Sequence, residues 1–254
     1  MRIGTWNVNS LKARLPHVLA WLKKNKPDVL LLQELKGLEF PAASIAALGY
    51  HAEFVAQKTY NGVAILSRHP IKVVATTLKG DEADSHARYL EADINGLRII
   101  NIYLPNGNPP GSDNFAYKLA WMDRFKKRLQ ALKKAKTPVV IGGDYNVIPT
   151  DIDCHNPKYW KSDALIQPEV QARFADWLKL GYVDAFRHVH GDETGQFTYF
   201  EYWRDMFGKN YGIRIDHFLV AAAVAKKIKD CRIDREPRAL EKPSDHCPVI
   251  LDLK

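Results

Sequence analysis

The sequence predicts a layered α/β fold, and three observations support this class. Short apolar runs that are typical of buried strands recur along the 254-residue chain. Between them lie segments whose apolar residues repeat at spacings of three and four, which is typical of helices. Polar residues flank several of the apolar runs. Because strand ends form the functional site in layered α/β proteins, these polar residues are expected to converge.

Composition predicts one domain that spans residues 1–254. The chain is 46% hydrophobic, enough for a large core, and no low-complexity tract marks a linker. The first residues form a strand pattern rather than a signal segment, and no apolar run approaches the roughly 18 residues of a membrane helix. We therefore expect a cytoplasmic protein without a membrane span. Three widely spaced cysteines, Cys154, Cys231 and Cys247, fit neither a disulfide framework nor a zinc site.

The chain is basic, with a formal charge of +8 and an isoelectric point of about 9.2. A polyanionic partner such as nucleic acid would explain this charge, and so would solubility alone. The lysines and arginines are spread through the sequence, so only some of them can contact a ligand.

The first strand is expected over residues 1–9. Ser10 then stands at the N-cap position of a helix over residues 11–24, and Pro27 ends that helix. The second strand runs to Glu34, which is either a surface residue past the core or a ligand for a hard cation. Together with Asn7 it is the best candidate for Mg²⁺ binding, because Mg²⁺ takes oxygen ligands and binds through one or two carboxylates.

A short helix near residues 42–47 precedes a turn that leads into the strand at 63–67. The turn contains Lys58, Tyr60 and Asn61, residue types that bind a phosphate backbone through donor groups. Arg88, on the next strand, either binds the phosphate backbone in the same way or is an ordinary charged residue on an edge strand.

The next strand, at residues 98–104, presents Tyr103 and, beyond a proline, Asn106. The polar loop at 107–112 leads into a helix over residues 114–135. Lys118 on this helix faces either the ligand or solvent.

A further apolar run at residues 137–141 leads into Gly142-Gly143-Asp144-Tyr145-Asn146. The two glycines allow a turn, and Asp144 and Asn146 then emerge on the same side at the strand's carboxyl end. A carboxylate and an amide presented together can activate and orient a water molecule, as a hydrolase requires. The alternative is a turn in which both side chains satisfy local backbone groups.

Asp151 lies in the loop that follows. Its side chain either caps a local backbone group, binds metal weakly or takes no part in the chemistry. A helix over residues 168–180 ends at Gly181. The aromatic segment 197–203 lies beside Arg204, and it serves either core packing or stacking against nucleic acid. Polar residues also end the run at 213–217 and precede the last apolar run, 247–251.

Eight motifs together resemble the exonuclease III family of AP endonucleases, in the endonuclease/exonuclease/phosphatase superfamily related to DNase I. Each is weak alone, but they occur in family order along essentially the whole chain. They are TWNVNS (5–10), LQELK (32–36), YNGVAILS (60–67), IYLPNG (102–107), GGDYNV (142–147), PTDID (149–153), GIRIDHFLV (212–220) and EKPSDHCPV (241–249).

The resemblance implies a four-layer α/β/β/α sandwich of two mixed sheets, an architecture that the strand and helix alternation fits but does not distinguish from a doubly wound sheet. It also implies a divalent-metal-dependent DNA phosphodiesterase of base-excision repair. Such an enzyme cuts 5′ to abasic sites, trims 3′ ends as an exonuclease or removes 3′ blocking groups. The implied partner is double-stranded DNA with abasic sites or 3′ ends, bound by a monomer.

By the same resemblance, Glu34 binds Mg²⁺ or Mn²⁺, Asp144 deprotonates the attacking water and His246, held by Asp245, stabilises the phosphoryl oxygens. The implied catalytic residues are Tyr103, Asp144, Asn146, Asp216, Asp245 and His246. The implied metal-binding residues are Glu34, Asn7, Asp144, Asn146, Asp245 and His246. The expected substrate-binding residues are Asn9, Lys58, Tyr60, Asn61, Arg88, Asn106, Lys118, Asp151, Tyr199, Ile213 and Ile215.

The chain departs from the family pattern in one region. Where relatives commonly have Trp-Trp-Asp-Tyr or Trp-Phe-Asp-Tyr followed by arginine, this chain has Tyr199-Phe200-Glu201-Tyr202-Trp203 with Arg204 one place later. In the family an apolar pocket receives the abasic sugar, and the motif spacing places Tyr199, Ile213 and Ile215 on its walls. The balance among abasic incision, 3′ trimming and 3′-end cleaning therefore stays open.

Two other function classes share some of these features. A superfamily phosphatase that acts on inositol phosphates or sphingolipids would share Glu34, Asp144 and the SDH motif, but the IYLPNG and GIRID motifs and the basic charge favour DNA. A nucleic-acid-binding regulator that had lost catalysis should lack site residues, and this chain lacks none of them.

Overall fold

The computed structural model describes residues 1–254 as two six-stranded sheets packed face to face. The first sheet contains, in spatial order, β11 (Ile228–Ile233), β12 (Val249–Leu253), β1 (Arg2–Asn7), β2 (Val29–Gln33), β4 (Val63–Ser67) and β3 (His51–Val55). The second contains β5 (Lys72–Ala75), β6 (Tyr89–Ile94), β7 (Leu97–Tyr103), β8 (Val139–Asp144), β10 (Asp216–Ala221) and β9 (Tyr182–Asp184). Each sheet is mixed, because β1 with β2 and β7 with β8 are parallel pairs among antiparallel ones.

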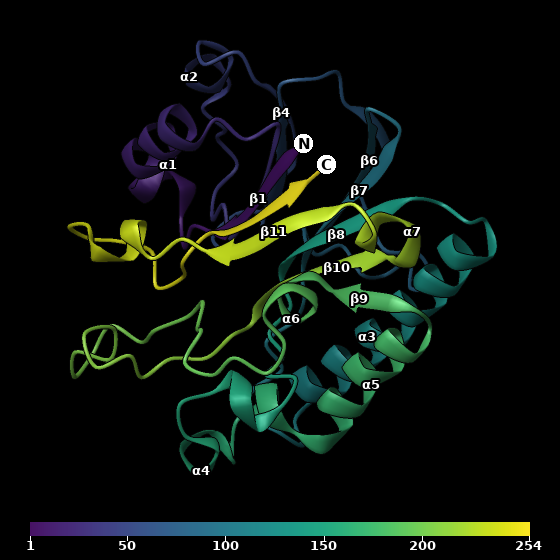
Figure 1. Cartoon of the computed structure of the whole chain (residues 1–254), viewed down its shortest axis with the longest axis vertical. Helices are drawn as coiled ribbons and strands as arrows, with labels where there is room; N and C mark the ends of the chain where they lie inside the picture. The colour runs from purple at the N-terminus through teal and green to yellow at the C-terminus, as the bar shows by residue number, and fades with distance from the viewer.

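Helices cover both outer faces (Figure 1). The first sheet is covered by α1 (Leu11–Asn25) and α2 (Ala42–Ala46), and the second by α3 (Asp113–Lys134) and α5 (Pro168–Lys179). The shorter helices are α4 (Pro157–Trp160), α6 (Ala185–His190) and α7 (Ala222–Ala225), with 3₁₀ turns η1 (Asp151–Asp153), η2 (Ala164–Ile166) and η3 (Glu236–Ala239). The predicted four-layer α/β/β/α sandwich is confirmed. None of the helices combines the length and apolarity that crossing a membrane requires.

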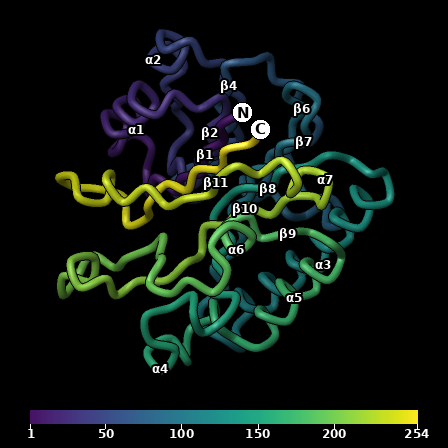
Figure 2. The backbone as a smooth tube through the Cα atoms, in the orientation of Figure 1, coloured from purple at the N-terminus to yellow at the C-terminus, as the bar shows by residue number.

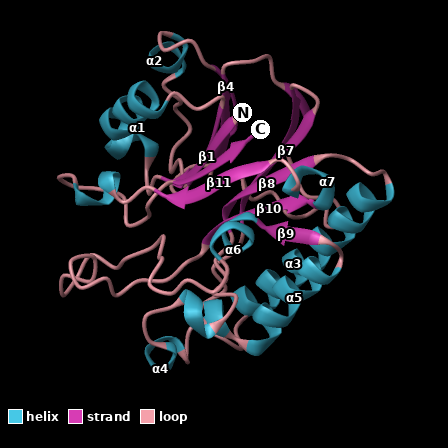
Figure 3. Ribbon diagram, in the orientation of Figure 1, coloured by secondary structure: helices cyan, strands magenta, loops and turns pink.

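Three apolar layers hold the sandwich together. Figure 3 shows the helices that flank the strands. The central layer joins the two sheets, with residues such as Leu31 and Ile65 of one facing Val140 and Phe218 of the other. The outer layers lie under α1 and under α3 with α5. Each outer helix buries one apolar stripe, which matches the spacing of three and four in its sequence.

The chain ends lie side by side (Figure 2), because the first and last strands pair with each other. Arg2 is opposite Asp252, and its guanidinium contacts that carboxylate at 2.8 Å. The pairing places Ser244 to His246, just before β12, next to the carboxyl end of β1. Residues from opposite ends of the sequence thereby reach one edge of the sandwich.

The two glycines before Asp144 lie within β8 rather than in a turn after it. A Cβ on Gly142 would come within 2.5 Å of Phe218, and a Cβ on Gly143 within 2.0 Å of the Ile102 carbonyl oxygen. Glycine is therefore required for close packing between strands and sheets, and the predicted role in turn formation is wrong. The strand continues to Asp144, which is its last residue.

A second correction concerns the run at residues 213–217, which was expected to end in polar residues as a strand does. The strand β10 instead begins at Asp216. It is antiparallel to β8, and Asp216 pairs with Asp144. The start of β10 therefore meets the end of β8, which still brings the two carboxylates to the same edge.

Candidate active site

Polar side chains from both sheets line one cavity of about 350 Å³ at this edge. Its residues are Asn9, Glu34, Lys36, Tyr103, Asn106, Asn108, Asp144, Asn146, Trp160, Asp163, Leu165, Tyr199, Glu201, Ile215, Asp245 and His246. Most of them lie just beyond a strand end or in the loop before β12. The structure thus brings together most of the residues that the sequence predicts, from segments more than 200 residues apart.

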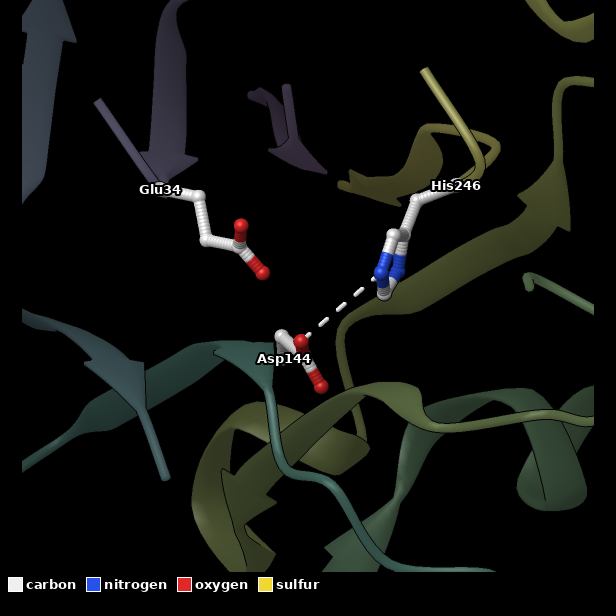
Figure 4. Close-up of side chains that lie close together, drawn as sticks. All are labelled: Glu34, Asp144 and His246. Carbon is white, nitrogen blue, oxygen red and sulfur yellow. Dashed lines mark ion pairs between the residues drawn. The ribbon is translucent and has the colours of Figure 1, made fainter. Parts of the chain in front are cut away.

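Glu34, Asp144 and His246 form the centre of this cavity (Figure 4). One potential ligand atom from each lies within 4.8 Å of the others. His246 Nε2 is 3.9 Å from Asp144 Oδ2, across the gap that Figure 4 marks with a dashed line. Glu34 directly follows the last residue of β2 and has a positive φ of 54°. This backbone turn directs its side chain toward Asp144 and His246.

Asn7 bridges the two carboxylates. Its Nδ2 donates to Glu34 Oε1 and to Asp144 Oδ2, each at 2.9 Å, while its Oδ1 accepts the backbone N–H of Asn9. Asn7 therefore presents amide hydrogens to the cluster, not the oxygen that a cation requires. A donor between two neighbouring carboxylates stabilises both, and the role of Asn7 as a metal ligand stays a prediction.

His246 is held by Asp216 and not by Asp245. The Nδ1 of His246 lies 2.8 Å from Asp216 Oδ2, both groups being buried. Asp245 instead accepts a hydrogen bond from Asn9 Nδ2 at 3.0 Å. The expected pairing of adjacent residues is wrong because neighbours in an extended segment project to opposite sides.

Burial and charge set the protonation of these groups. Burial is the main factor that raises the pKa of Asp144, with Asp216 adding to it and His246 opposing it. Burial alone would lower the pKa of His246, but the charge and hydrogen bond of Asp216 raise it to about 10. For Glu34, burial raises the pKa, yet the Lys36 charge and the Asn7 hydrogen bond leave it lowered overall. At neutral pH the site therefore contains an imidazolium, an anionic glutamate and an aspartate with weakened acidity.

Tyr103 reaches the cluster from the end of β7. Its hydroxyl donates to Glu34 Oε1 at 2.9 Å, and burial together with the charge of Glu34 raises the pKa of Tyr103, which keeps it a neutral donor. Arg88 packs on the other side of the ring, with its guanidinium carbon 4.8 Å from the ring centroid. Arg88 therefore supports Tyr103 and does not line the cavity.

Asn146 is fixed from three directions. Its backbone N–H donates to Asp144 Oδ1, its Nδ2 donates to the carbonyl of Leu104, and its Oδ1 accepts from Asn106 Nδ2. Lys118 is fully buried beneath it and donates to the backbone carbonyls of Asn106 and Asn146. Lys118 therefore ties two loops of the site together, which contradicts the expectation that it faces the ligand or solvent.

One wall of the cavity is apolar. The Tyr199 ring lies 5.0 Å from the His246 ring, edge to face, and Ile215 and Trp160 line the same side. Ile213 does not line the cavity. Its side chain is fully buried and its backbone forms bridges to Tyr199 and Cys154, so its predicted place on the wall is wrong.

Four other predicted substrate contacts lie outside the cavity. Lys58 and Tyr60 are exposed on the loop before β4, and Asn61 is buried there with its Nδ2 on Gln57. Asp151 is exposed at the start of η1. The structure does not bring these side chains to the central cluster.

Lys36 was missed as a site residue, although it belongs to the LQELK motif. Its Nζ lies 2.7 Å from Glu34 Oε2 and 2.6 Å from Asn9 Oδ1. The signal in the sequence was a cation two residues beyond a carboxylate at a strand end. Asn108 and Asp163, which bond to each other at 3.0 Å, were also missed because they come from separate loops.

The donor set suits a hard divalent cation. Glu34 is anionic, its carboxylate faces that of Asp144, and no thiol lies in the cavity. His246, as an imidazolium whose Nδ1 is engaged by Asp216, is suited to donate to an anion and not to ligate a metal. Asn146 Oδ1 and Asp245 Oδ1 already accept hydrogen bonds from other residues, and neither belongs to the central cluster.

Comparison with known proteins agrees with this geometry. The endonuclease/exonuclease/phosphatase family model matches residues 4–246. The exodeoxyribonuclease III of Haemophilus influenzae is 33% identical over 268 aligned positions that cover 100% of both chains. A 3′ phosphatase from Neisseria, solved with a product DNA hairpin, is 40% identical with a TM-score of 0.96 over 100% of this chain and 99% of that one.

An AP endonuclease from Archaeoglobus fulgidus is 36% identical, also with a TM-score of 0.96, over 100% of this chain and 99% of that one. The match therefore extends over essentially the whole sequence and both sheets. The chain belongs to the endonuclease/exonuclease/phosphatase family, as a hydrolytic nuclease of the exodeoxyribonuclease III type.

Proposed function

We propose that this protein is an Mg²⁺- or Mn²⁺-dependent phosphodiesterase of DNA base-excision repair that acts on double-stranded DNA at abasic sites and at 3′ ends. The observation that carries the proposal is the convergence of Glu34, Asp144 and His246 within 4.8 Å in one polar cavity. The similar proteins support the choice of DNA, since they are named an exodeoxyribonuclease, a 3′ phosphatase and an AP endonuclease.

A phosphodiester carries a negative charge that repels a hydroxide nucleophile, so its oxygens must be neutralised while a base faces the phosphorus. His246 supplies part of this charge: its Nε2–H points into the cavity while Asp216 holds Nδ1. Glu34 would hold the divalent cation, which supplies further positive charge to the phosphate when bound.

Asp144 is proposed as the base that deprotonates the attacking water. Its raised pKa makes it a stronger base than an exposed aspartate, and general bases act best when their pKa is close to the working pH. The Asn7 hydrogen bond fixes Asp144 Oδ2 in place. Tyr103 and Asn106 line the same cavity and are proposed to contact the remaining phosphate oxygens.

Tyr199 and Ile215 are proposed to receive the deoxyribose of an abasic nucleotide or of a 3′ end. A sugar without a base costs little to extrude, because no stacking or pairing is lost. An intact nucleotide is larger, so a cavity of about 350 Å³ that also accommodates the phosphate selects for the small residue. We further propose a cytoplasmic, monomeric enzyme in which residues 1–254 form one domain.

The direct test is incubation with three duplexes that carry an abasic site, a recessed 3′ end or a 3′ phosphate. We expect cleavage of at least one with Mg²⁺ or Mn²⁺ and none with EDTA. Soluble inositol phosphates serve as the comparison substrate. Cleavage of those esters without cleavage of DNA would overturn the proposal.

A further inference from the structure

The structure has a second cavity besides the catalytic one. It is a groove of about 640 Å³ beside it, lined by Lys12, Leu15, Leu35, Lys36, Gly37, Leu38, Glu39, Phe40, Pro41 and Lys58. We call it the Leu38 groove. It lies between the first turn of α1, the segment after β2 and the loop before β4.

The Leu38 groove borders the catalytic cavity at Lys36, which lines both. Lys36 has a positive φ of 51°, two residues after the positive φ of Glu34. These two turns direct the chain from the cluster into the groove. A β-bridge between Gly37 and Gln57 then fixes this segment against the loop that carries Lys58. The groove therefore lies next to the place where a ligand of Glu34 would bind.

The lining combines apolar surface with a net positive charge, since it contains three lysines and one acid, Glu39. Leu38 is 64% exposed, and Phe40 is half-buried with its ring stacked on Phe54 at 4.4 Å. Lys12 and Lys58 are exposed at the margins. Of the three lysines, only Lys36 forms an ion pair, with Glu34. An exposed leucine next to an aromatic ring within a basic frame suits a ligand that is flat and apolar in one part and anionic in another.

A nucleotide has these properties, since its base stacks on apolar and aromatic side chains while its phosphate attracts lysines. A paired base cannot enter the groove, because it is stacked within the duplex. We propose, building on the proposed function, that the Leu38 groove binds one unpaired nucleotide of the DNA strand next to the scissile phosphate. Leu38 and Phe40 contact the base, and Lys12 and Lys58 contact its phosphates. The enzyme then prefers ends at which pairing has been lost.

The test compares two duplexes of identical length and charge, measured by fluorescence anisotropy in EDTA so that no cleavage occurs. In one, the two nucleotides at a recessed 3′ end are paired; in the other they are mismatched. Because stacking of one base on a side chain strengthens binding by about fivefold or more, the wild type should bind the mismatched end at least about fivefold more tightly. Leu38→Ser should remove this preference and keep the affinity for the paired end within about twofold.

Leu178→Ser is the matched control, because Leu178 is a partly exposed leucine on α5, outside the groove. It should retain the preference of the wild type. Lys12→Ala and Lys58→Ala should weaken binding to both ends, since both ends carry the same phosphates. A 4-thiothymidine at the mismatched position should crosslink to the peptide that contains Phe40.

A preference unchanged in Leu38→Ser, or a crosslink only to other segments, would overturn the inference. Such a result would favour a protein partner as the occupant of the groove. Cleavage of abasic duplex with Mg²⁺ separates the two proposals. If the wild type cleaves but binds both ends equally, the groove inference fails and the nuclease function stands. If it cleaves no DNA, the function fails, whatever the binding comparison gives.

Discussion

Asp216 Oδ2 lies 2.8 Å from His246 Nδ1, and the two residues reach each other from the start of β10 and the loop before β12. The pair is buried, so its Coulomb interaction is weakly screened. Asp216 is the main reason that the pKa of His246 is raised despite its burial. The charge state of His246 therefore depends on a residue 30 positions away in the sequence and not on its neighbour.

Replacing Asp216→Asn should lower the pKa of His246. The pKa of His246 in the folded protein is raised, so the stability that this pair contributes is fully present below the unfolded pKa of about 6.5. That stability is lost as pH rises through about 10. Urea unfolding in EDTA at pH 6, 8 and 10 should therefore show a smaller loss of stability with rising pH in Asp216→Asn than in the wild type. Asp245→Asn is the comparison: the charge of Asp245 raises the pKa of His246 less than Asp216 does, so this variant should change the slope less. Equal slopes in all three proteins would contradict the pairing.

Replacing Glu34→Gln should weaken metal binding more than DNA binding. The change keeps the size of the side chain but removes the anionic charge that attracts a divalent cation. We expect the Mg²⁺ concentration for half-maximal cleavage to rise by at least about tenfold, the scale of a change of 1.4 kcal/mol. DNA affinity in EDTA should change by less than about threefold. A metal requirement identical to that of the wild type would exclude Glu34 as the metal-binding residue.

Replacing Tyr199→Ala should impair abasic incision more than removal of a 3′ phosphate. The ring forms the apolar wall beside His246, and its loss enlarges the space for an extruded sugar. A terminal 3′ phosphate needs the cation and His246 but no buried sugar. Rates on the two substrates are compared at matched salt, with Tyr199→Phe as the control that keeps the wall. Equal losses on both substrates would show that Tyr199 acts only in packing.

A buried ionic cluster beneath the site should contribute strongly to stability. Arg214 is fully buried, with its Nε 2.7 Å from Asp153 and its Nη1 2.9 Å from Asp184. Asp153→Asn leaves Arg214 with one partner fewer and should lower the free energy of unfolding by ~3 kcal/mol. Urea denaturation at pH 7 measures this loss, and Asp151→Asn, an exposed neighbour, is the control.

The Arg214 charge and its hydrogen bond also offset the burial of Asp153 and lower its pKa to about 2. Because this folded pKa is depressed, the stability from the pair is present above the unfolded pKa of about 3.9 and is lost as pH falls toward 2. Wild type and Asp153→Asn should therefore converge in stability over that range. A constant difference between them would contradict the ion pair.

Much of the site could be predicted because an apolar run followed by polar residues marks the end of a strand. Glu34 follows an apolar run at the end of β2, and Asp144 ends β8, so both emerge where the sequence places them. His217, in contrast, is buried and accepts from Arg214 at 2.9 Å, as expected of a core histidine. Local pattern is sufficient wherever the side chain's direction is fixed by its own strand.

The rest depended on tertiary contacts that local pattern does not encode. The alternation of apolar and polar residues says nothing about which strand β10 pairs with, so the contact of Asp216 with His246 could not be derived from it. The burial of Lys118 follows from two loops that fold over α3 and offer it carbonyl oxygens. Ile213 and Ile215 are two residues apart and both belong to the core under α3 and α5, yet only Ile215 lines the cavity. Ile213 instead forms β-bridges to Tyr199 and Cys154.

The most direct test of the central claim is the single-turnover rate of abasic-duplex incision in Mg²⁺, compared between wild type and Asp144→Asn. The asparagine keeps the shape and the hydrogen-bonding positions of Asp144 but cannot take the proton of the attacking water. We predict a rate at least ~10²-fold lower, with DNA affinity equal to or higher than that of the wild type. A rate within threefold of the wild type, or a loss of activity that only parallels a loss of DNA binding, would contradict the assignment of Asp144 as the base.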